Sequence, residues 1–188
     1  MNVLKRVYLT MFKYIYPPVY HTYGTAAPVT IKNLIVQKVL GVNKSAYWPM
    51  DKTSSVTDTD KIMIGIGTAP GLSQGCYIQG KGGIELGDYT IVAPNVGLIS
   101  ANHDIYDTSI HVPGKITIGK YCWLGMNSVV LPNVNLGDFT IVGAGSVVTK
   151  SFSEGYCIIA GNPAKIIKKL DPDKCIKKEN KYKYYDLH

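Results

Sequence analysis

The stretch KITIGKYCWLGMNSVVLPNVNLGDFTIVGAGSVVTK, residues 115–150, repeats an aliphatic residue at every sixth position. The repeated residues are Ile118, Leu124, Val130, Leu136, Val142 and Val148. A period of six fits neither the 3.6-residue turn of an α-helix nor the two-residue alternation of an ordinary strand. Hexapeptide self-similarity is typical of a parallel β-helix. We therefore predict an all-β fold built on a coil whose flat sides each use one hexapeptide.

The coil should be a triangular prism with aliphatic side chains pointing inward. Three sides close one turn in about 18 residues, and neighbouring turns lie about 4.8 Å apart, the ordinary strand spacing. The predicted stacked pairs are Ile118 with Leu136, Leu124 with Val142, and Val130 with Val148. Glycines at 119, 125, 137 and 143 follow four of the repeated positions, and we expect them to form corners or to permit close approach.

An earlier hexapeptide series is interrupted twice. It runs through Ile66, Leu72, Ile78 and Ile84, slips by two, and resumes as Leu86, Val92 and Leu98. Glycines at 80, 82 and 83 lie near the slip, where a bulge or wide corner could absorb the extra residues. The interval from Leu98 to Ile118 is 20 residues, which is not a multiple of six. We therefore expect residues 102–115 to leave the coil as an extruded loop.

The flanking segments are expected to cap the coil. Residues 1–60 form an N-terminal segment with one amphipathic helix, in which Ile31, Leu34, Ile35, Val39 and Leu40 share a face and Gly41 ends the helix. Residues 61–160 form the coil. Residues 161–188 form a short C-terminal helix, with Asn162 as N-cap and Pro163 in the first turn, followed by a basic tail.

Composition limits the partners and the compartment. The net charge of +7 favours anionic partners, but no nucleic-acid module accompanies it, so we expect no nucleic acid. The four cysteines have neither metal-ligand nor disulfide-framework spacing, which indicates reduced thiols and a cytoplasmic protein without a metal. The sequence has no good signal peptide and no apolar run long enough to span a membrane. Weak association of the tyrosine-rich N-terminus with a membrane surface stays open.

Three segments carry a resemblance to a known family. They are YTIVAPNVGLISANHD, the stretch at residues 115–150, and AGNPAK. Over residues 62–170 the chain resembles the hexapeptide-repeat acyltransferases, nearest to polysaccharide and sugar O-acetyltransferases of the colanic-acid and maltose/galactoside type. The resemblance implies a left-handed parallel β-helix, a homotrimer with active sites between subunits, and acetyl-CoA as donor. The six-residue period by itself does not set the hand of the coil.

The resemblance makes His103 the general base. A histidine suits this role because its ordinary pKa lies near neutrality. The second ring nitrogen needs a partner that holds it. Glu85 lies 18 residues earlier and would sit one turn below His103 if the coil were unbroken between them. Asp104, Asp107 and a backbone carbonyl are the alternatives.

The resemblance also places an oxyanion site and a donor site. Trp123, Gly125 and Met126 match the turn beside the reacting centre, and a backbone N–H at Gly125 or Met126 is the candidate oxyanion donor. Family matches predict coenzyme A contacts at Ala144, Thr149, Lys150, Lys165 and Lys168, the lysines for phosphate. Candidate acceptor contacts are Asn95, Asn102, Asp104 and His111.

Other functions remain to be separated from this one. A streptogramin- or chloramphenicol-type drug acetyltransferase would share the fold and the base. A zinc carbonic anhydrase on the same coil needs three imidazoles, and only His103 and His111 lie near the coil. A covalent acyl-enzyme at Cys76 or Cys122 lacks a partner base by spacing. A non-catalytic scaffold would bind no coenzyme A.

Overall fold

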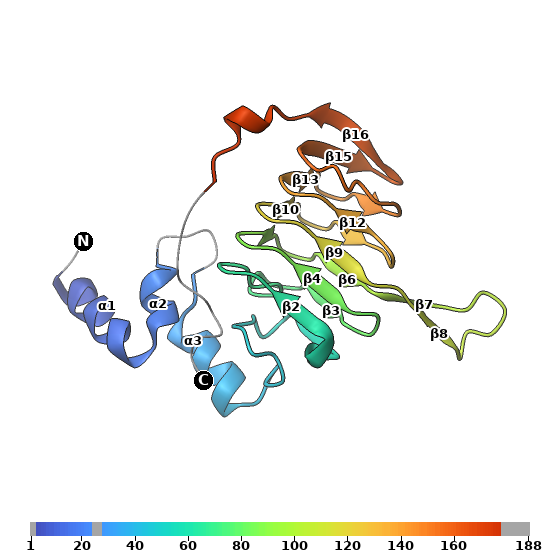
Figure 1. Cartoon of the computed structure of the whole chain (residues 1–188). Helices are drawn as coiled ribbons and strands as arrows, with labels where there is room; N and C mark the ends of the chain where they lie inside the picture. Colours follow the sequence, from blue (N-terminus) through green and yellow to red (C-terminus); the bar gives the residue numbers. More distant parts are fainter. Residues whose placement is uncertain (1–2, 24–27, 178–188) are drawn as a thin grey trace.

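A computed structural model describes residues 3–23 and 28–177, and its centre is a stack of short strands in three sheets, whose strands are parallel except at one end of the third sheet (Figure 1). Sheet I contains β1 (Ser55–Thr57), β3 (Tyr77–Gln79), β6 (Gly97–Ile99), β11 (Val129–Val130) and β14 (Val147–Val148). Sheet II contains β2 (Ile62–Ile64), β4 (Ile84–Leu86), β9 (Ile116–Ile118) and β12 (Asn135–Leu136). Sheet III contains β5 (Ile91–Val92), β10 (Trp123–Leu124), β13 (Thr140–Val142), β15 (Cys157–Gly161) and β16 (Ala164–Lys169). The chain visits the sheets in the order I, II, III, which makes a parallel β-helix with three edges.

The strand register confirms the hexapeptide stacking. Leu136 pairs with Ile118, Val142 with Leu124, and Val148 with Val130, and all six side chains are buried. A second inward position, two residues before each of these, was not predicted. Its occupants are Ile116, Cys122, Ser128, Val134, Thr140 and Ser146, which are also buried. All of them except Ile116 are small side chains.

The two-residue slip in the first series has a simple structural cause. Strand β4 buries both Ile84 and Leu86, with Glu85 between them. Ile84 pairs with Ile62 and Ile116, whereas Leu86 pairs with Ile64 and Ile118. Ile78 occupies the level of Val130 in sheet I, and Leu86 that of Leu136 in sheet II, but eight residues separate Ile78 from Leu86 along the chain and six separate Val130 from Leu136. The two extra residues lie in the I–II corner at residues 80–83, where the Gly83 N–H donates to the Gly80 carbonyl, so the expected wide corner is confirmed.

The residues that adopt the left-handed corner conformation differ from those that allow neighbouring turns of the coil to approach closely. Gly119, Gly125, Gly137 and Gly143 provide close approach: a Cβ at Gly125 would lie 2.6 Å from the Val142 carbonyl oxygen. The left-handed corners are instead formed by asparagines, aromatic residues and other glycines, such as Asn127, with φ 58°, and Tyr121, with φ 56°. At the II–III edge the aromatic corners stack: ring centroids are 5.2 Å apart for Tyr89–Tyr121 and 4.8 Å apart for Tyr121–Phe139.

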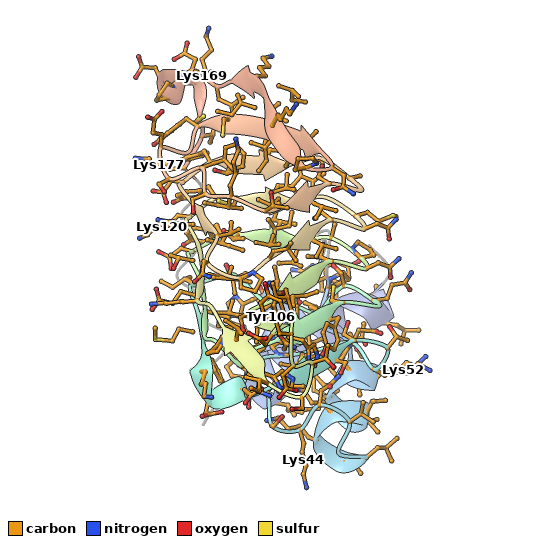
Figure 2. The ribbon with its side chains drawn as sticks, turned by 90° about the vertical axis from the view of Figure 1, so that its right-hand side faces the viewer. Lys44, Lys52, Tyr106, Lys120, Lys169 and Lys177 are labelled. Atoms are coloured by element: carbon orange, nitrogen blue, oxygen red, sulfur yellow. The ribbon has the colours of Figure 1, made fainter. Side chains whose placement is uncertain are left out.

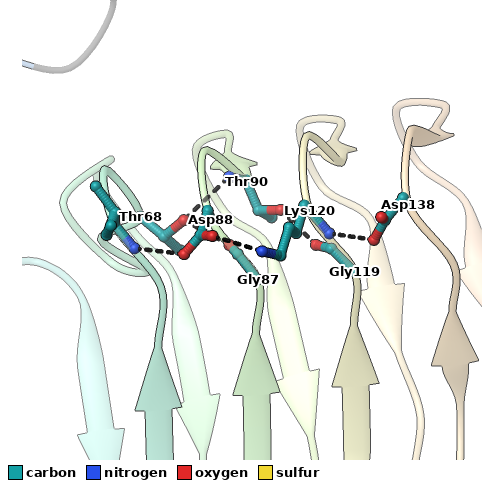
Figure 3. A network of polar contacts seen from close by, with 8 residues as sticks. Thr68, Gly87, Asp88, Thr90, Gly119, Lys120 and Asp138 are labelled. Carbon is teal, nitrogen blue, oxygen red and sulfur yellow. Dashed lines mark hydrogen bonds and ion pairs between the residues drawn. The ribbon is translucent and has the colours of Figure 1, made fainter. Parts of the chain in front are cut away.

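Polar side chains tie neighbouring turns together at the same edge (Figure 3). The Thr68 hydroxyl donates to the Gly87 carbonyl at 2.8 Å and accepts from the Thr90 N–H at 3.0 Å. The buried Thr90 hydroxyl donates to the Gly119 carbonyl at 2.8 Å. Lys120 continues the ladder, with its ammonium 2.9 Å from Asp88 and its N–H donating to Asp138 at 2.7 Å.

The coil is interrupted between β6 and β9 by an antiparallel hairpin. It consists of β7 (Ala101–His103) and β8 (His111–Pro113) and projects from the I–II edge (Figure 1). The predicted extruded loop thus takes the form of a hairpin. Figure 2 views the molecule from this side, with Tyr106 of the hairpin loop facing the reader.

The helices lie in the N-terminal segment, as Figure 1 shows. They are α1 (Val3–Ile15), α2 (Pro17–His21), α3 (Ile31–Leu34) and the continuing π-helical turn η1 (Ile35–Val39); 3₁₀ turns are η2 (Thr59–Lys61) and η3 (Pro172–Lys174). Helices α1 and α2 were not predicted. None of the helices in residues 3–23 and 28–177 is long and apolar enough to cross a membrane. Trp48 and Met50 are buried in the core at this end, and the Trp48 indole N–H donates to the Pro70 carbonyl at 2.7 Å.

The predicted helix after residue 30 is confirmed, but the prediction of which of its faces is buried is wrong. Thr30 and Asn33 form a capping box at its start, and Gly41, with φ 78°, follows its end. Ile35, Val39 and Leu40 are exposed, whereas Gln37 is buried and its amide donates to the carbonyls of Ala46 and Trp48. The side chain of Gln37 satisfies carbonyls of the following loop, and this fixes which face turns inward.

The predicted C-terminal helix is also wrong. Residues Ala164–Lys169 form β16, which pairs antiparallel with β15. Gly161 pairs with Ala164, so Asn162 and Pro163 form the turn of a hairpin rather than a helix start. Asn-Pro is a turn signal as well as a capping signal, and pairing with the open edge of β15 satisfies backbone groups that a helix would leave bare. The basic tail at residues 178–188 lies outside the described residues.

Candidate functional site

The hairpin brings two histidines together. His103 ends β7 and pairs across the hairpin with His111, the first residue of β8. Their ring centroids are 4.4 Å apart, with an angle of 43° between the ring planes. Both residues are reachable from solvent, His103 more so than His111.

A backbone carbonyl holds one nitrogen of His103. Nδ1 lies 2.5 Å from the carbonyl oxygen of Thr108. Because a carbonyl can only accept, Nδ1 carries a proton, and in the neutral ring the lone pair therefore lies on Nε2. This is the tautomer that a general base needs. The backbone-carbonyl alternative raised from the sequence therefore describes this contact.

Two aspartates shape the loop that carries Thr108. Asp104 Oδ1 accepts from the N–H groups of Tyr106 and Asp107, at 2.8 and 3.1 Å. Asp107 Oδ1 accepts from the N–H and hydroxyl of Ser109, at 2.9 and 2.6 Å. The bonds from Ser109 hold the pKa of Asp107 below its ordinary value. Both carboxylates thus fix the loop, and neither makes the bond that holds the His103 ring.

The register expected for Glu85 is wrong. Glu85 pairs with Thr117 of β9, since the hairpin removes His103 from the coil. The carboxylate of Glu85 lies 2.6 Å from the ammonium nitrogen of Lys115. A turn of the coil that contains an extruded segment no longer places residues 18 apart above one another. Glu85 is therefore an ion-pair partner of Lys115 at the base of the hairpin.

The second histidine lies in a positive environment. The pKa of His111 is lowered, first by desolvation and then by electrostatic interaction with Lys81 and with His103. His111 therefore favours its neutral form. Asn102, opposite Val112 in the hairpin, is exposed and free to meet a ligand.

The predicted oxyanion residues lie at another edge of the prism. Trp123 is half-exposed on the outer face of sheet III, and Gly125 and Met126 follow at the III–I edge. The Gly125 N–H already donates to the Val142 carbonyl at 2.8 Å, so the expectation of an oxyanion donor at Gly125 is wrong. The Met126 N–H makes no hydrogen bond within the described part of the chain, although its carbonyl accepts from Gly145. Met126 thus keeps the free donor.

The predicted donor contacts divide among three places. Ala144 follows β13 at the III–I edge, one turn of the coil from Met126 and two turns from Asn95. Thr149 and Lys150 follow β14 at the I–II edge, and both are exposed. Lys165 and Lys168 are exposed on β16, opposite Ala160 and Ile158 of β15.

One chain therefore does not bring all these residues together. His103 projects from the I–II edge, whereas Met126 lies at the III–I edge. Between them along the coil run the strands β9 of sheet II and β10 of sheet III.

The cysteines are poor nucleophile candidates. Burial raises the pKa of Cys122 to about 12 and also raises the pKa of Cys76 and Cys157. The Cys122 thiol donates to the Gly137 carbonyl inside the coil. The four cysteines are free, and residues 3–23 and 28–177 contain no cluster of three or more metal-ligating side chains.

Sequence reasoning missed two contributors to the hairpin. Thr108 acts through its backbone carbonyl, and any residue type supplies that group, so no sequence signal marks it. Lys81 lies 22 residues before His103, in a glycine-rich corner that was interpreted only as the site of a slip. Its proximity to His111 follows from the stacking of the corner under the hairpin.

Comparison with known proteins identifies the repeat. Residues 115–150 match the family model described as bacterial transferase hexapeptide (six repeats). No curated protein sequence matches the chain significantly. The chain therefore carries the hexapeptide repeat of bacterial transferases.

Solved structures share the fold at low sequence identity. A galactoside acetyltransferase in complex with coenzyme A is 19% identical, with a TM-score of 0.61, over 97% of this chain and 98% of the other. A maltose O-acetyltransferase from Clostridium difficile 630 is 22% identical, with a TM-score of 0.60, over 90% and 88%. A mutant N-acyltransferase from Bacillus cereus, in complex with dTDP and coenzyme A, is 22% identical, with a TM-score of 0.51, over 67% and 82%. At these identities the similarity establishes the fold.

Proposed function

We propose that this protein is an acetyl-CoA-dependent O-acetyltransferase that acts on a hydroxyl of a sugar or surface-polysaccharide precursor. The observation that carries the proposal is the contact between His103 Nδ1 and the Thr108 carbonyl, which leaves Nε2 free as a base. Support comes from the shared fold with sugar acetyltransferases, one of them solved with coenzyme A.

The chemistry is a direct transfer. Nε2 of His103 takes the proton of the acceptor hydroxyl while the oxygen attacks the thioester carbonyl. The Met126 N–H stabilises the oxyanion of the tetrahedral intermediate. The C–S bond then breaks, and the imidazolium returns its proton to the leaving thiolate. Products are the acetyl ester and free coenzyme A, and no cysteine is acylated.

The active unit in this proposal is a homotrimer with sites between subunits. Its support is the separation of His103 and Met126 on different edges, which a neighbouring copy would overcome. The donor would contact Ala144, Thr149 and Lys150, with Lys165 and Lys168 near its phosphates. The proposal includes a left-handed coil. It also includes a cytoplasmic location, with which the free cysteines are consistent.

Acceptor contacts are assigned to the exposed hairpin and the facing edge. Asn102 and His111 offer a side-chain amide and an imidazole beside the base, and Asn95 lies at the III–I edge. Asp104 is engaged within the loop, so it contributes to the shape of the acceptor site rather than as a free carboxylate.

The test is a thiol-release assay with acetyl-CoA and a panel of maltose, galactosides, nucleotide sugars and lipid-linked glycans. We expect release of free coenzyme A with at least one acceptor and a matching acetyl ester by mass spectrometry. Calorimetry with coenzyme A alone provides an independent readout. Absence of coenzyme A binding would overturn the proposal and favour a scaffold, whereas acetylation of chloramphenicol or a streptogramin alone would favour a drug-modifying enzyme.

The shared site is tested by mixing two inactive variants. His103→Ala removes the base, and Met126→Pro removes the candidate N–H at the other edge. Co-expressed chains should regain activity, because some interfaces then combine two intact edges. Circular dichroism checks that both variants fold, and native mass spectrometry checks that they form trimers. Failure to regain activity, with both variants folded and trimeric, contradicts a site shared between subunits.

A further inference from the structure

Helix α1 presents an apolar face to solvent. Leu9 and Phe12 are buried on its inner side. The exposed apolar side chains are Val3, Leu4, Val7, Tyr8, Met11, Tyr14 and Ile15, of which Val3, Leu4 and Tyr14 are 75%, 76% and 78% exposed. Their spacings of four, seven and eight residues place them in adjacent rows on one helix face. In Figure 1 this helix lies beside the coil and away from its strands.

The N-terminal segment that carries this face has charged residues of a single sign. Residues 1–50 contain six lysines and arginines and no aspartate or glutamate, although the whole chain has 13 acidic residues. The first fifty residues therefore carry six of the seven surplus positive charges. On α1 itself, Arg6 lines the same shallow surface as Val7 and Met11, and the Lys13 ammonium lies 5.8 Å from the centroid of the Tyr14 ring. Apolar surface beside unopposed basic charge is typical of helices that bind anionic membrane surfaces.

We propose that α1 binds the surface of an anionic phospholipid bilayer, with its apolar face in the headgroup region and Arg6 and Lys13 toward lipid phosphates. The 13 residues of α1 span about 20 Å, which is shorter than the hydrocarbon core, so the helix lies along the surface. Tyr8 and Tyr14 suit this depth because tyrosine favours the membrane interface.

Charge argues for lipid rather than for a second copy of this helix. Two such helices packed face to face would bring their basic residues together, and the N-terminal fifty residues offer no carboxylate to offset them. A phosphate-rich surface supplies the opposite charge along the whole helix. The match of both apolar area and charge therefore favours the bilayer.

The test is flotation of the full chain with vesicles of phosphatidylcholine alone or with about 30% phosphatidylglycerol. We expect binding only to the anionic vesicles. The double variant Val7→Asp, Met11→Asp should bind about a hundredfold more weakly, since it loses two membrane-buried side chains. Arg6→Gln and Lys13→Gln should each weaken binding about fivefold. A matched control, Met63→Asp with Ile176→Asp, changes two exposed apolar residues outside α1 and should bind normally.

Two other measurements keep the outcomes separate. Thermal melting of the double variant should be unchanged, because Val7 and Met11 are 63% and 47% exposed. Native mass spectrometry of the double variant reports whether the apolar face of α1 is a contact between copies of the chain. Loss of the oligomer in the double variant, or no binding of the unaltered chain to anionic vesicles, would overturn the proposal. Equal weakening in the control and the α1 variants would overturn it as well.

Membrane binding has a consequence for substrate that rests on the proposed function. A helix on the bilayer would hold the acetyl-transfer site near lipid-anchored glycans. Vesicle binding needs no acceptor and no acetyl-CoA, so a failure to bind vesicles would not count against the acetyltransferase proposal. Likewise, a failure to transfer acetyl groups would not count against membrane binding.

Discussion

The imidazole of His103 donates its Nδ1 proton to the backbone carbonyl of Thr108, across 2.5 Å within one hairpin. This contact fixes both the tautomer and the direction of the ring. It also depends on a loop that Asp104 and Asp107 hold in shape. The base is therefore oriented by a local turn that lies outside the repeating coil.

Replacing the base provides the most direct measurement. His103→Ala should lower turnover by about a hundredfold to ten-thousandfold, the usual effect of losing a general base. Donor affinity should change little, because the ring acts on the acceptor hydroxyl. His103→Asn is the matched control for the loop: its amide can still donate to Thr108 but cannot act as a base. Near-normal turnover in both variants would remove His103 from the mechanism.

The charge of Lys81 should control the titration of His111. Lys81→Gln removes a positive charge that lowers the pKa of His111, so that pKa should rise toward its ordinary value. It should not return fully, because desolvation is the larger cause. Since the folded state disfavours the protonated ring, acidification through the ordinary histidine range works against the native hairpin. NMR titration of the ring protons measures the shift, and a lower pKa in the variant would contradict it.

Two lysines on β16 should contribute to donor binding through charge. Lys165→Ala with Lys168→Ala is expected to weaken coenzyme A binding about tenfold at low salt, and much less near 1 M salt, where screening is strong. Lys44→Ala with Lys52→Ala is the control, because these residues lie at the other end of the molecule from β16 (Figure 2). Calorimetry at two salt concentrations gives the comparison. A loss independent of salt would exclude a phosphate contact.

A buried hydroxyl should stabilise the coil. Thr90→Val leaves the Gly119 carbonyl without its 2.8 Å donor and the Cys122 N–H without its 3.2 Å acceptor. We expect a loss of about 1–3 kcal/mol in the free energy of unfolding by urea. Thr117→Val on the outer face of sheet II should change it by less than about 0.5 kcal/mol. Equal effects would mean that the ladder in Figure 3 adds no stability.

The native thiols should differ sharply in reactivity. Because the pKa of Cys122 is about 12, its thiolate fraction at pH 8 is small, and alkylation should be about a thousandfold slower than for an exposed thiol. Mass spectrometry should find Cys175, the least buried of the four, modified first. Incubation with acetyl-CoA alone should leave no acetyl group on Cys76 or Cys122. An acetyl-thioester at either residue would contradict direct transfer.

The sequence by itself determined the coil. Inward aliphatic residues at a six-residue period can be buried together only if the backbone turns at each hexapeptide, so the stacking of Val130 on Val148 follows from local pattern. The interruption at residues 102–115 was also visible, because its length breaks the period.

Tertiary structure alone decided where the chemistry lies. The hairpin takes His103 out of the coil, so a spacing of 18 residues no longer places Glu85 directly below it. Glu85 instead forms an ion pair with Lys115. Residues 164–169 form a strand because they pair with the open edge of β15, which satisfies backbone hydrogen-bonding groups of both segments. Backbone groups decided both the hold on His103 and the free N–H of Met126, and backbone groups are the same in every residue, so no side-chain pattern could reveal them.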